Sequence, residues 1–299
     1  MSRPGSVSFR ANHSGAALVT VVLLAWLLMA ACSGPTNASR PTPRPTRIAG
    51  TPSVATTPEP ARGQITVYAA SSLTDAFRDL GKSFESAYPE SKVTFNFAAS
   101  SALATQITEG APADVFASAD NAQMMVVTEK GYAEQSKVFA ENLAVIAVPS
   151  DDTAVRSLED LAKPGIKLVL ANADVPVGRY AREILLKASA GGAIDPHFYD
   201  DVLRNLQSNE ANVRAVLVKV QLGEADAGVV YQTDIAAAGG DVKAVEIPRQ
   251  YNVVARYLVA AIPQSKNPAG AHAFIDYLMS DAGQAILAKY GFNKPGPGQ

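Results

Sequence analysis

The feature that most constrains the fold is a repeated alternation of short β-branched runs with longer segments of helical periodicity. Ile65–Ala69 reads as a strand, and the segment Leu73–Tyr88 places its apolar residues on one face of a helix. This alternation predicts an α/β chain in which helices flank mostly parallel sheets. Further strands are expected at 93–97, 114–117, 143–148, 167–171, 227–231 and 258–262, and further helices at 101–109, 120–131, 178–190, 196–203, 213–222, 269–279 and 281–290.

The first 31 residues have the organisation of a secretory signal. Basic residues precede the apolar run Ala16–Ala31, which is shorter than the about 20 residues that span a bilayer. The run ends beside Cys32, the only cysteine of the chain, and Leu28–Cys32 resembles the lipobox of bacterial lipoproteins. We predict a lipoprotein-type signal peptide over residues 1–31, a lipidated Cys32 and an exported protein. The alternative is an ordinary cleaved signal with an incidental cysteine.

The segment after the signal has the composition of a tether. Residues 33–62 contain seven prolines and six threonines and almost no large apolar side chains, so they cannot bury a core. We expect a Pro/Thr-rich tether over residues 32–62. Removal of Arg3 and Arg10 with the signal lowers the 26 basic residues to 24, against 28 acidic residues, for a net charge of −4. This acidic balance argues against binding to nucleic acid.

Several segments place hydroxyls or backbone amides where a strand ends and a helix begins. The first turn of a helix has N–H groups without intrahelical partners and carries the positive end of the helix dipole. Ligands of parallel sheets bind beyond the carboxyl ends of the strands, and helix starts there attract anions. The five segments of this kind together predict an anion site built from uncharged donors. The segments are Ala69–Thr74, Phe97–Ser101, Val175–Gly178, Asn209–Arg214 and Gly228–Tyr231.

Each of these residues also has a simpler interpretation. Ser72 and Ser100 have the position of helix N-caps, and Asp75 completes a capping-box pattern with Ser72. A capping hydroxyl accepts one hydrogen bond and still has its own proton to donate. Either Asn209 or Asn212 can cap the following helix. Residues with a purely structural alternative are Tyr231, as a core or rim tyrosine, and Ser71, Thr74 and Ser101, as local caps.

Enzymatic interpretations have less support in the sequence. His197 and His272 do not have the spacing of metal ligands, and no Gly-x-Ser-x-Gly motif is present to activate a serine. Asp120 follows a strand without a basic or metal-binding partner in the pattern and is interpreted as a cap. No enzyme activity and no catalytic residue are therefore predicted. A secreted hydrolase that uses Ser72 or Ser100 as its nucleophile is the alternative from another functional class.

Several motifs resemble the periplasmic molybdate-binding proteins of bacterial ABC importers. They are YAASSLTDAF at Tyr68–Phe77, GAPADVFASAD at Gly110–Asp120, GEADAGVVY at Gly223–Tyr231 and ILAKYGF at Ile286–Phe292. The resemblance extends from about residue 65 to residue 292. It implies a two-lobed periplasmic-binding-protein type II fold, in which two crossovers join two α/β lobes. Lobe 1 is expected at 63–142 plus about 240–299, and lobe 2 at 143 to about 239.

The resemblance also implies how the anion is bound. Molybdenum would be held as molybdate, without coordination of the metal by a side chain and without any cofactor. Ser71 and Ser101 are expected beside the ligand-binding residues, and Ser71 stands where alanine is frequent. The implied ligand-binding groups are the hydroxyls and amides of Ser72 and Ser100, the backbone amides of Val177 and Val213, and the phenol of Tyr231.

The function implied by the resemblance is the capture of molybdate, and of tungstate, outside the cytoplasm. We expect a monomer in the periplasm or at the outer face of the membrane, anchored through Cys32, that delivers the anion to an ABC permease and its ATPase. Neutral donors predict nearly constant binding between about pH 6 and 9, because serine and amide groups do not titrate there. A receptor for another tetrahedral oxyanion, such as sulfate or thiosulfate, and a signalling receptor with the same lobes are alternatives.

Overall fold

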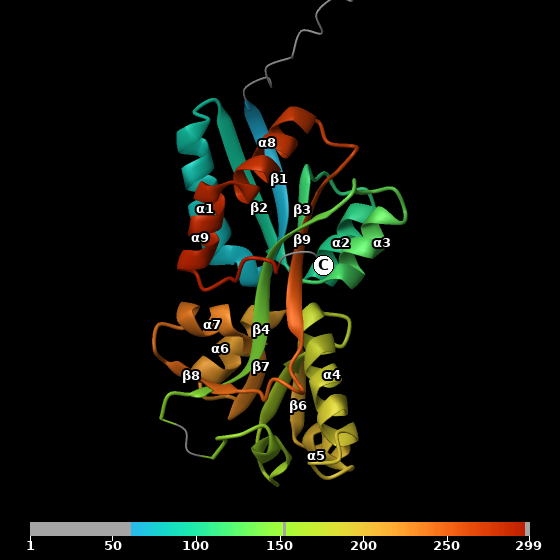
Figure 1. Ribbon diagram of the computed structural model, residues 1–299, viewed down its shortest axis with the longest axis vertical. Helices are drawn as coiled ribbons and strands as arrows, with labels where there is room; N and C mark the ends of the chain where they lie inside the picture. Colours follow the sequence, from blue (N-terminus) through green and yellow to red (C-terminus); the bar gives the residue numbers. More distant parts are fainter. Residues whose placement is uncertain (1–60, 152–153, 297–299) are drawn as a thin grey trace, which may run out of the picture. The chain divides into compact units, whose positions relative to one another are not determined.

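The computed structural model of the protein describes residues 61–151 and 154–296. The predicted signal peptide, the lipidated Cys32 and the tether up to residue 60 lie outside the described residues. In the described part of the chain, no helix has both the length and the apolar character needed to cross a membrane. The expected α/β class is confirmed, because helices flank a mixed β-sheet (Figure 1).

Within the described residues, nine strands form the sheet: β1 (Gly63–Ala70), β2 (Ser91–Ala98), β3 (Val115–Ser118), β4 (Lys137–Pro149), β5 (Leu168–Ala171), β6 (Leu206–Glu210), β7 (Ala227–Tyr231), β8 (Val242–Glu246) and β9 (Val254–Ala261). Their order is β2-β1-β3-β9-β4-β7-β5-β6, with β8 beside β4. Pairing is parallel between β1 and both β2 and β3, and between β5 and both β6 and β7. The pairs that involve β4 or β9 are antiparallel.

The helices follow the strands in sequence, as the alternation predicts. The helices of the described residues are the short 3-10 helices η1 (Ser71–Leu73) and η2 (Glu159–Ala162), and the α-helices α1 (Thr74–Ala87), α2 (Ser100–Thr108), α3 (Asn121–Thr128), α4 (Pro176–Ala190), α5 (Phe198–Arg204), α6 (Val213–Gln221), α7 (Gln232–Ala237), α8 (Pro268–Met279) and α9 (Asp281–Lys289). Most of the α-helices begin within two residues of the expected position, whereas η2 and α7 were not expected.

The strands β4 and β9 connect two groups of elements. We call β1, β2 and β3 with η1, α1, α2 and α3 the first group, and β5, β6 and β7 with α4, α6 and α7 the second group. Residues 137–143 of β4 pair with β9, whereas residues 144–149 pair with β7 and β8. Figure 1 shows β4 running from beside β9, which pairs with β3 of the first group, to beside β7 in the second group. One continuous strand therefore belongs to the sheet of both groups.

The start of α1 is fixed by an aromatic core. The helix buries Ala76, Phe77, Leu80 and Phe84, the apolar face expected from the periodicity. The ring of Phe274 in α8 lies 6.2 Å from Phe77 and 5.5 Å from Phe84, both in edge-on contacts. Such contacts add specific geometry to the burial of apolar area. They hold α1, and the 3-10 turn η1 before it, in a defined position against the sheet.

Candidate functional site

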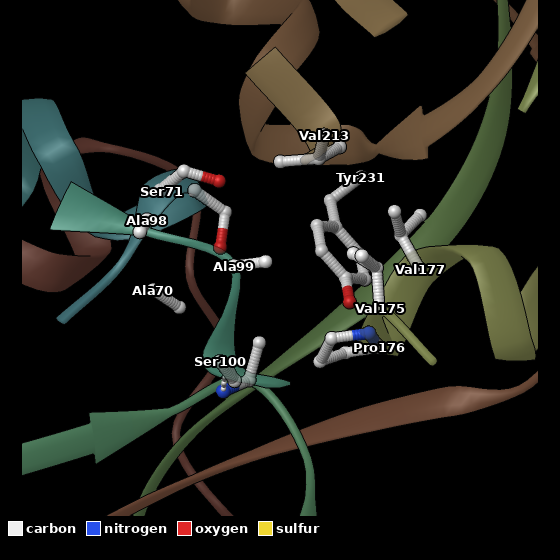
Figure 2. A pocket seen from close by; sticks show the side chains of 12 residues that line it. Ala70, Ser71, Ala98, Ala99, Ser100, Val175, Pro176, Val177, Val213 and Tyr231 are labelled. Atoms are coloured by element: carbon white, nitrogen blue, oxygen red, sulfur yellow. Dashed lines mark hydrogen bonds between the residues drawn. The ribbon is translucent and has the colours of Figure 1, made fainter. Parts of the chain in front are cut away.

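A small hollow lies between the first and second groups. Its empty volume, counted with the space open to solvent, is about 190 Å³. The part of this space that a water-sized molecule can occupy is only about 10 Å³, so the hollow is nearly closed and is too small for a drug-sized ligand. None of the side chains that line it is charged. The lining residues are Ala70, Ser71, Ser72, Ala98, Ala99, Ser100, Ala119, Val175, Pro176, Val177, Val213 and Tyr231 (Figure 2).

The hollow brings together the five residues expected to bind an anion. The ends of β1 and β2 contribute Ser72 and Ser100 from the first group. The starts of α4 and α6 and the end of β7 contribute Val177, Val213 and Tyr231 from the second. All five residues are buried, with at most 3% of their surface exposed. Buried residues from separate parts of the chain thus line one hollow.

Ser72 is not the helix cap that the sequence suggests. It lies inside the 3-10 turn η1, and α1 begins only at Thr74, so the expected capping box with Asp75 is wrong. The Ser72 hydroxyl instead lies 2.9 Å from the phenol oxygen of Tyr257, which is fully buried. The amide of Asn142 donates to that same phenol oxygen at 3.5 Å, a weak contact. This arrangement favours Tyr257 as donor to Ser72 and leaves the proton of Ser72 for a ligand.

Ser100 is likewise not a cap, although its hydroxyl is held in place. The cap position of α2 is Ala99, and Ser100 is the first helical residue. The backbone N–H of Ala119 donates to the Ser100 hydroxyl oxygen at 3.0 Å. Because the oxygen already accepts this bond, the hydroxyl proton is left to point elsewhere. The expected property, a serine hydroxyl able to donate into the hollow, is retained by a different local structure.

The two valines present backbone amides at helix starts. Pro176 is the first residue of α4 and Val177 the second, and no side chain caps this helix. Val213 is the first residue of α6, whose cap is Asn212, one of the two expected candidates. Asn212 accepts from the N–H of Ala215 at 3.0 Å, so the capping bond does not involve Val213. The first amides of a helix have no intrahelical acceptor, and both valines line the hollow.

Tyr231 carries a buried polar atom without a partner. Its residue is 1% exposed, and its phenol oxygen has no hydrogen-bond partner among the described residues. In Figure 2 the ring lies between Val213 and Pro176. Burial raises the pKa of the Tyr231 phenol well above its usual value of 10, so the group stays protonated and able to donate. Buried polar groups in proteins almost always have partners, and an exception of this kind is typical of a ligand contact.

The two neighbouring serines differ. Ser71 lines the hollow and is 7% exposed. Ser101 is also buried but does not line the hollow. Tyr257 and Asn142, which hold Ser72 in place, were missed by the sequence reasoning. Tyr257 lies 185 residues from Ser72 in the chain, so no local pattern announces the pair.

The arrangement does not favour catalysis by serine or a structural metal. The partners of the two serines are a phenol and a backbone N–H, neither of which is a general base. His197 and His272 are exposed and do not line the hollow. Among residues 61–151 and 154–296, no group of three or more His, Cys, Asp or Glu side chains is arranged to hold a metal ion. The polar groups that line the hollow are hydroxyls, a phenol and helix-start amides.

Comparisons with known proteins agree with this geometry. Residues 65–293 match the family model described as bacterial extracellular solute-binding protein. The molybdate-binding protein ModA of Mycobacterium tuberculosis is 37% identical over 280 residues, which cover 93% of this chain and 97% of that protein. The periplasmic molybdate-binding protein of Azotobacter vinelandii has a similar fold, with a TM-score of 0.67 and 19% identity over 78% of this chain and all (100%) of that one.

A sulfate receptor shares the fold as well. The sulfate-binding protein SubI of Mycobacterium tuberculosis has a TM-score of 0.72 and 17% identity, and the match covers 79% of this chain and 88% of that protein. At such identity the likeness concerns the fold alone. Proteins named for two different anions thus share this fold, so the fold alone does not identify a ligand.

Proposed function

The chain belongs to the family of bacterial extracellular solute-binding proteins, and on this premise we propose that it captures molybdate and delivers it to an ABC permease and its ATPase. The proposal includes tungstate, which matches molybdate in size and charge. The site we propose consists of Ser72 and Ser100 from the first group, and Val177, Val213 and Tyr231 from the second. We further propose that residues 63–142 with about 240–299, and residues 143 to about 239, act as two lobes that enclose the anion.

The observation that carries the proposal is the chemistry of the lining. Among the described residues, the hollow presents hydroxyls, helix-start amides and a buried phenol without a partner, and no charged side chain lines it. A dianion brought from water into such a place loses a large hydration energy and needs a donor for each oxygen. Hydrogen bonds to a charged group contribute about 1.5–3 kcal/mol each. Uncharged donors therefore suit an oxyanion that has no proton of its own to place.

The same chemistry implies a ranking of anions. Monohydrogen phosphate carries a proton that needs an acceptor, and a site built to donate leaves that proton unpaired. Sulfate has the charge of molybdate but is smaller, so its discrimination depends on the fit of the hollow. Tungstate presents the same four oxygens at nearly the same distance. We expect molybdate and tungstate to bind alike, sulfate more weakly and phosphate most weakly.

Titration calorimetry on the purified protein tests this ranking. Molybdate, tungstate, sulfate, thiosulfate and phosphate are titrated in turn at one pH and one salt concentration. Micromolar or tighter binding of molybdate, with sulfate at least tenfold weaker, supports the proposal. Sulfate or thiosulfate bound as tightly as molybdate would reassign the protein to another oxyanion. Stoichiometric labelling of Ser72 or Ser100 by a serine-reactive phosphonate would instead favour a hydrolase.

Replacement of Ser100 by alanine should weaken molybdate binding by about 1.5–3 kcal/mol, the range for one hydrogen bond to a charged group. The matched control is Ser101→Ala, because Ser101 is the next residue of the same helix and does not line the hollow. Calorimetry on both variants measures the difference. Unchanged affinity in Ser100→Ala, or equal losses in the two variants, would remove the Ser100 hydroxyl from the proposed site.

Molybdate affinity should be nearly constant from about pH 7 to 9. Hydroxyl and amide donors do not titrate in this range, and burial keeps the pKa of Tyr231 above it. The lower limit is set by Asp234, whose carboxylate accepts from the backbone N–H of Tyr231 at 3.0 Å. Burial raises the pKa of Asp234 to about 6. Calorimetry at several pH values checks this, and a tenfold change between pH 7 and 9 would contradict a site of neutral donors.

The place of action follows from the family and from the N-terminal sequence. Extracellular solute-binding proteins work outside the cytoplasm, and we propose that this one is tethered to the membrane through a lipid on Cys32 and acts as a monomer. Mass spectrometry of the processed protein tests the anchor, since a diacylglycerol on an N-terminal Cys32 is expected. Cleavage at another residue, with no lipid on the processed protein, would contradict the proposed anchor.

A further inference from the structure

Two arginines follow the valines of the proposed site closely in sequence. Arg179 follows Val177 by two residues in α4, and Arg214 follows Val213 by one residue in α6. Neither arginine lines the hollow. Each reaches out of the second group to a carboxylate of the first group. They therefore join the two sets of donors without touching the space where an anion would lie.

On one side, Arg179 reaches the segment that holds Ser100. Its Nη2 atom donates to Oδ2 of Asp120 at 2.7 Å, and Asp120 is fully buried. The other carboxylate oxygen of Asp120 caps α3 by accepting from the N–H of Gln123 at 2.8 Å. Asp120 follows Ala119, whose N–H bonds the Ser100 hydroxyl. The pair thus ties the start of α4 to the loop that orients Ser100.

A second contact runs beside this ion pair. The side-chain amide of Gln123 in α3 donates to the backbone carbonyl of Asp174, just before α4, at 3.2 Å. Asp174 is exposed, so this bond is weaker than the ion pair that Arg179 makes with the buried Asp120. It nevertheless joins the same two elements, α3 and the start of α4.

On the other side, Arg214 reaches the segments that hold Ser72 and Tyr231. Its Nη2 atom donates to Oδ2 of Asp75, in the first turn of α1, at 2.8 Å. Its Nε atom lies 3.0 Å from Oδ1 of the fully buried Asp234, an ion pair without good hydrogen-bond geometry. Asp234 in turn accepts from the backbone N–H of Tyr231. One guanidinium therefore connects the start of α1, the start of α6 and the end of β7.

The charges of these groups show what the arginines do. Each guanidinium already has a carboxylate partner within 3.0 Å, so it adds little net positive charge to the hollow. Their effect on an anion is then geometric. Asp120 is fully buried, so its separation from Arg179 is costly, and this pair resists separation of the elements that it joins. Asp75 is partly exposed, so its pair with Arg214 resists separation less strongly. Separation of those elements is what release of an enclosed anion requires.

We propose that Arg179 and Arg214 are positioning residues that hold the two donor sets together around the anion and so set its rate of release. The proposal rests on the function proposed above. In kinetic terms, loss of either pair should raise the dissociation rate of molybdate and leave its association rate nearly unchanged. A role in electrostatic attraction would have the opposite signature, a lower association rate that depends on salt.

Release of radiolabelled molybdate into an excess of unlabelled anion measures the dissociation rate directly. The variants are Arg179→Gln, Asp120→Asn and their double variant. Asparagine at 120 retains a capping oxygen for α3, so Asp120→Asn removes the charge with little loss of the cap. We expect each single variant to release molybdate about 5- to 30-fold faster, and the double variant to be no faster than the faster single variant. Arg214→Gln and Asp75→Asn form the second cycle.

The outcomes separate this inference from the proposed function. If the unaltered protein does not bind molybdate, the proposed function fails, and the inference that rests on it fails with it. If it binds and the variants release molybdate at the unaltered rate, only the role of the arginines is overturned. Additive effects in the double variant, or a change confined to the association rate, also overturn it. Thermal unfolding of each ligand-free variant identifies a general loss of structure, which would count against a specific role.

Discussion

Gly178→Ala should abolish tight anion binding and also destabilise the protein. Gly178 is the third residue of α4, directly after the Val177 amide. A Cβ atom at this position would overlap the backbone carbonyl oxygens of Asn172 and Ala171, which cannot move aside as a flexible side chain would. The start of α4 must then shift away from the end of β5. The Val177 amide and the wall formed by Val175 and Pro176 shift with it.

The expected losses can be given a size. Overpacking of a rigid position costs about 1–3 kcal/mol of stability. Displacement of the Val177 amide removes a hydrogen bond to a charged ligand and distorts the wall beside it, so we expect affinity to fall by about 3 kcal/mol or more, over 100-fold. Calorimetry with molybdate and urea unfolding of the ligand-free protein measure the two quantities separately.

Gly283→Ala is the matched control. Gly283 is also the third residue of a helix, α9, and a Cβ there would overlap the carbonyl oxygens of Tyr277 and Leu278 in the same way. It does not line the hollow. We expect a similar loss of stability and no loss of affinity in the folded protein. Equal affinity losses in the two variants, or full affinity in Gly178→Ala, would contradict a role for the start of α4.

Two strands that carry the site, β5 and β7, could be predicted from the sequence because they are fully buried. β7 has the residues Ala227–Tyr231 that the apolar run predicts, and β5 differs from its expected range by one residue. β6, with the sequence LQSNE, was missed because it is polar and pairs only with β5 at an edge of the sheet. The first half of β4 was missed for a related reason, since Lys137 and Glu141 interrupt the apolar pattern. An edge or half-exposed strand has no run of apolar residues to reveal it.

For the site, position in the chain was predictable and local hydrogen bonding was not. The five residues line one hollow as expected because each lies at the end of a strand or shortly after it. The capping roles of Ser72 and Ser100 were wrong, since a 3-10 turn precedes α1 and since Ala119 binds the Ser100 hydroxyl. The hydrogen-bond partners of Ser72 and Ser100 are Tyr257 and Ala119, which lie 185 and 19 residues away along the chain. Tertiary contacts of this kind override local propensity, and no sequence pattern encodes them.

Tyr231→Phe should change affinity and stability differently. The phenol of Tyr231 is buried without a partner among the described residues, so its removal leaves no protein group unpaired. We expect the free energy of unfolding of the ligand-free protein not to fall, because loss of an unsatisfied buried polar group is neutral or favourable. Molybdate should bind more weakly by about 3 kcal/mol, over 100-fold, since one anion oxygen then faces an apolar ring edge.

Tyr257→Phe is the control that makes this result specific. Tyr257 is equally buried and its ring lies 5.9 Å from that of Tyr231, but its phenol oxygen bonds Ser72 at 2.9 Å. Its loss should lower the free energy of unfolding by about 1 kcal/mol and weaken molybdate binding less than Tyr231→Phe, because Ser72 keeps its own proton. Calorimetry and urea unfolding on both variants compare the pair. If Tyr231→Phe loses stability and keeps affinity, its phenol belongs to the core of the protein, and the anion must be bound without it.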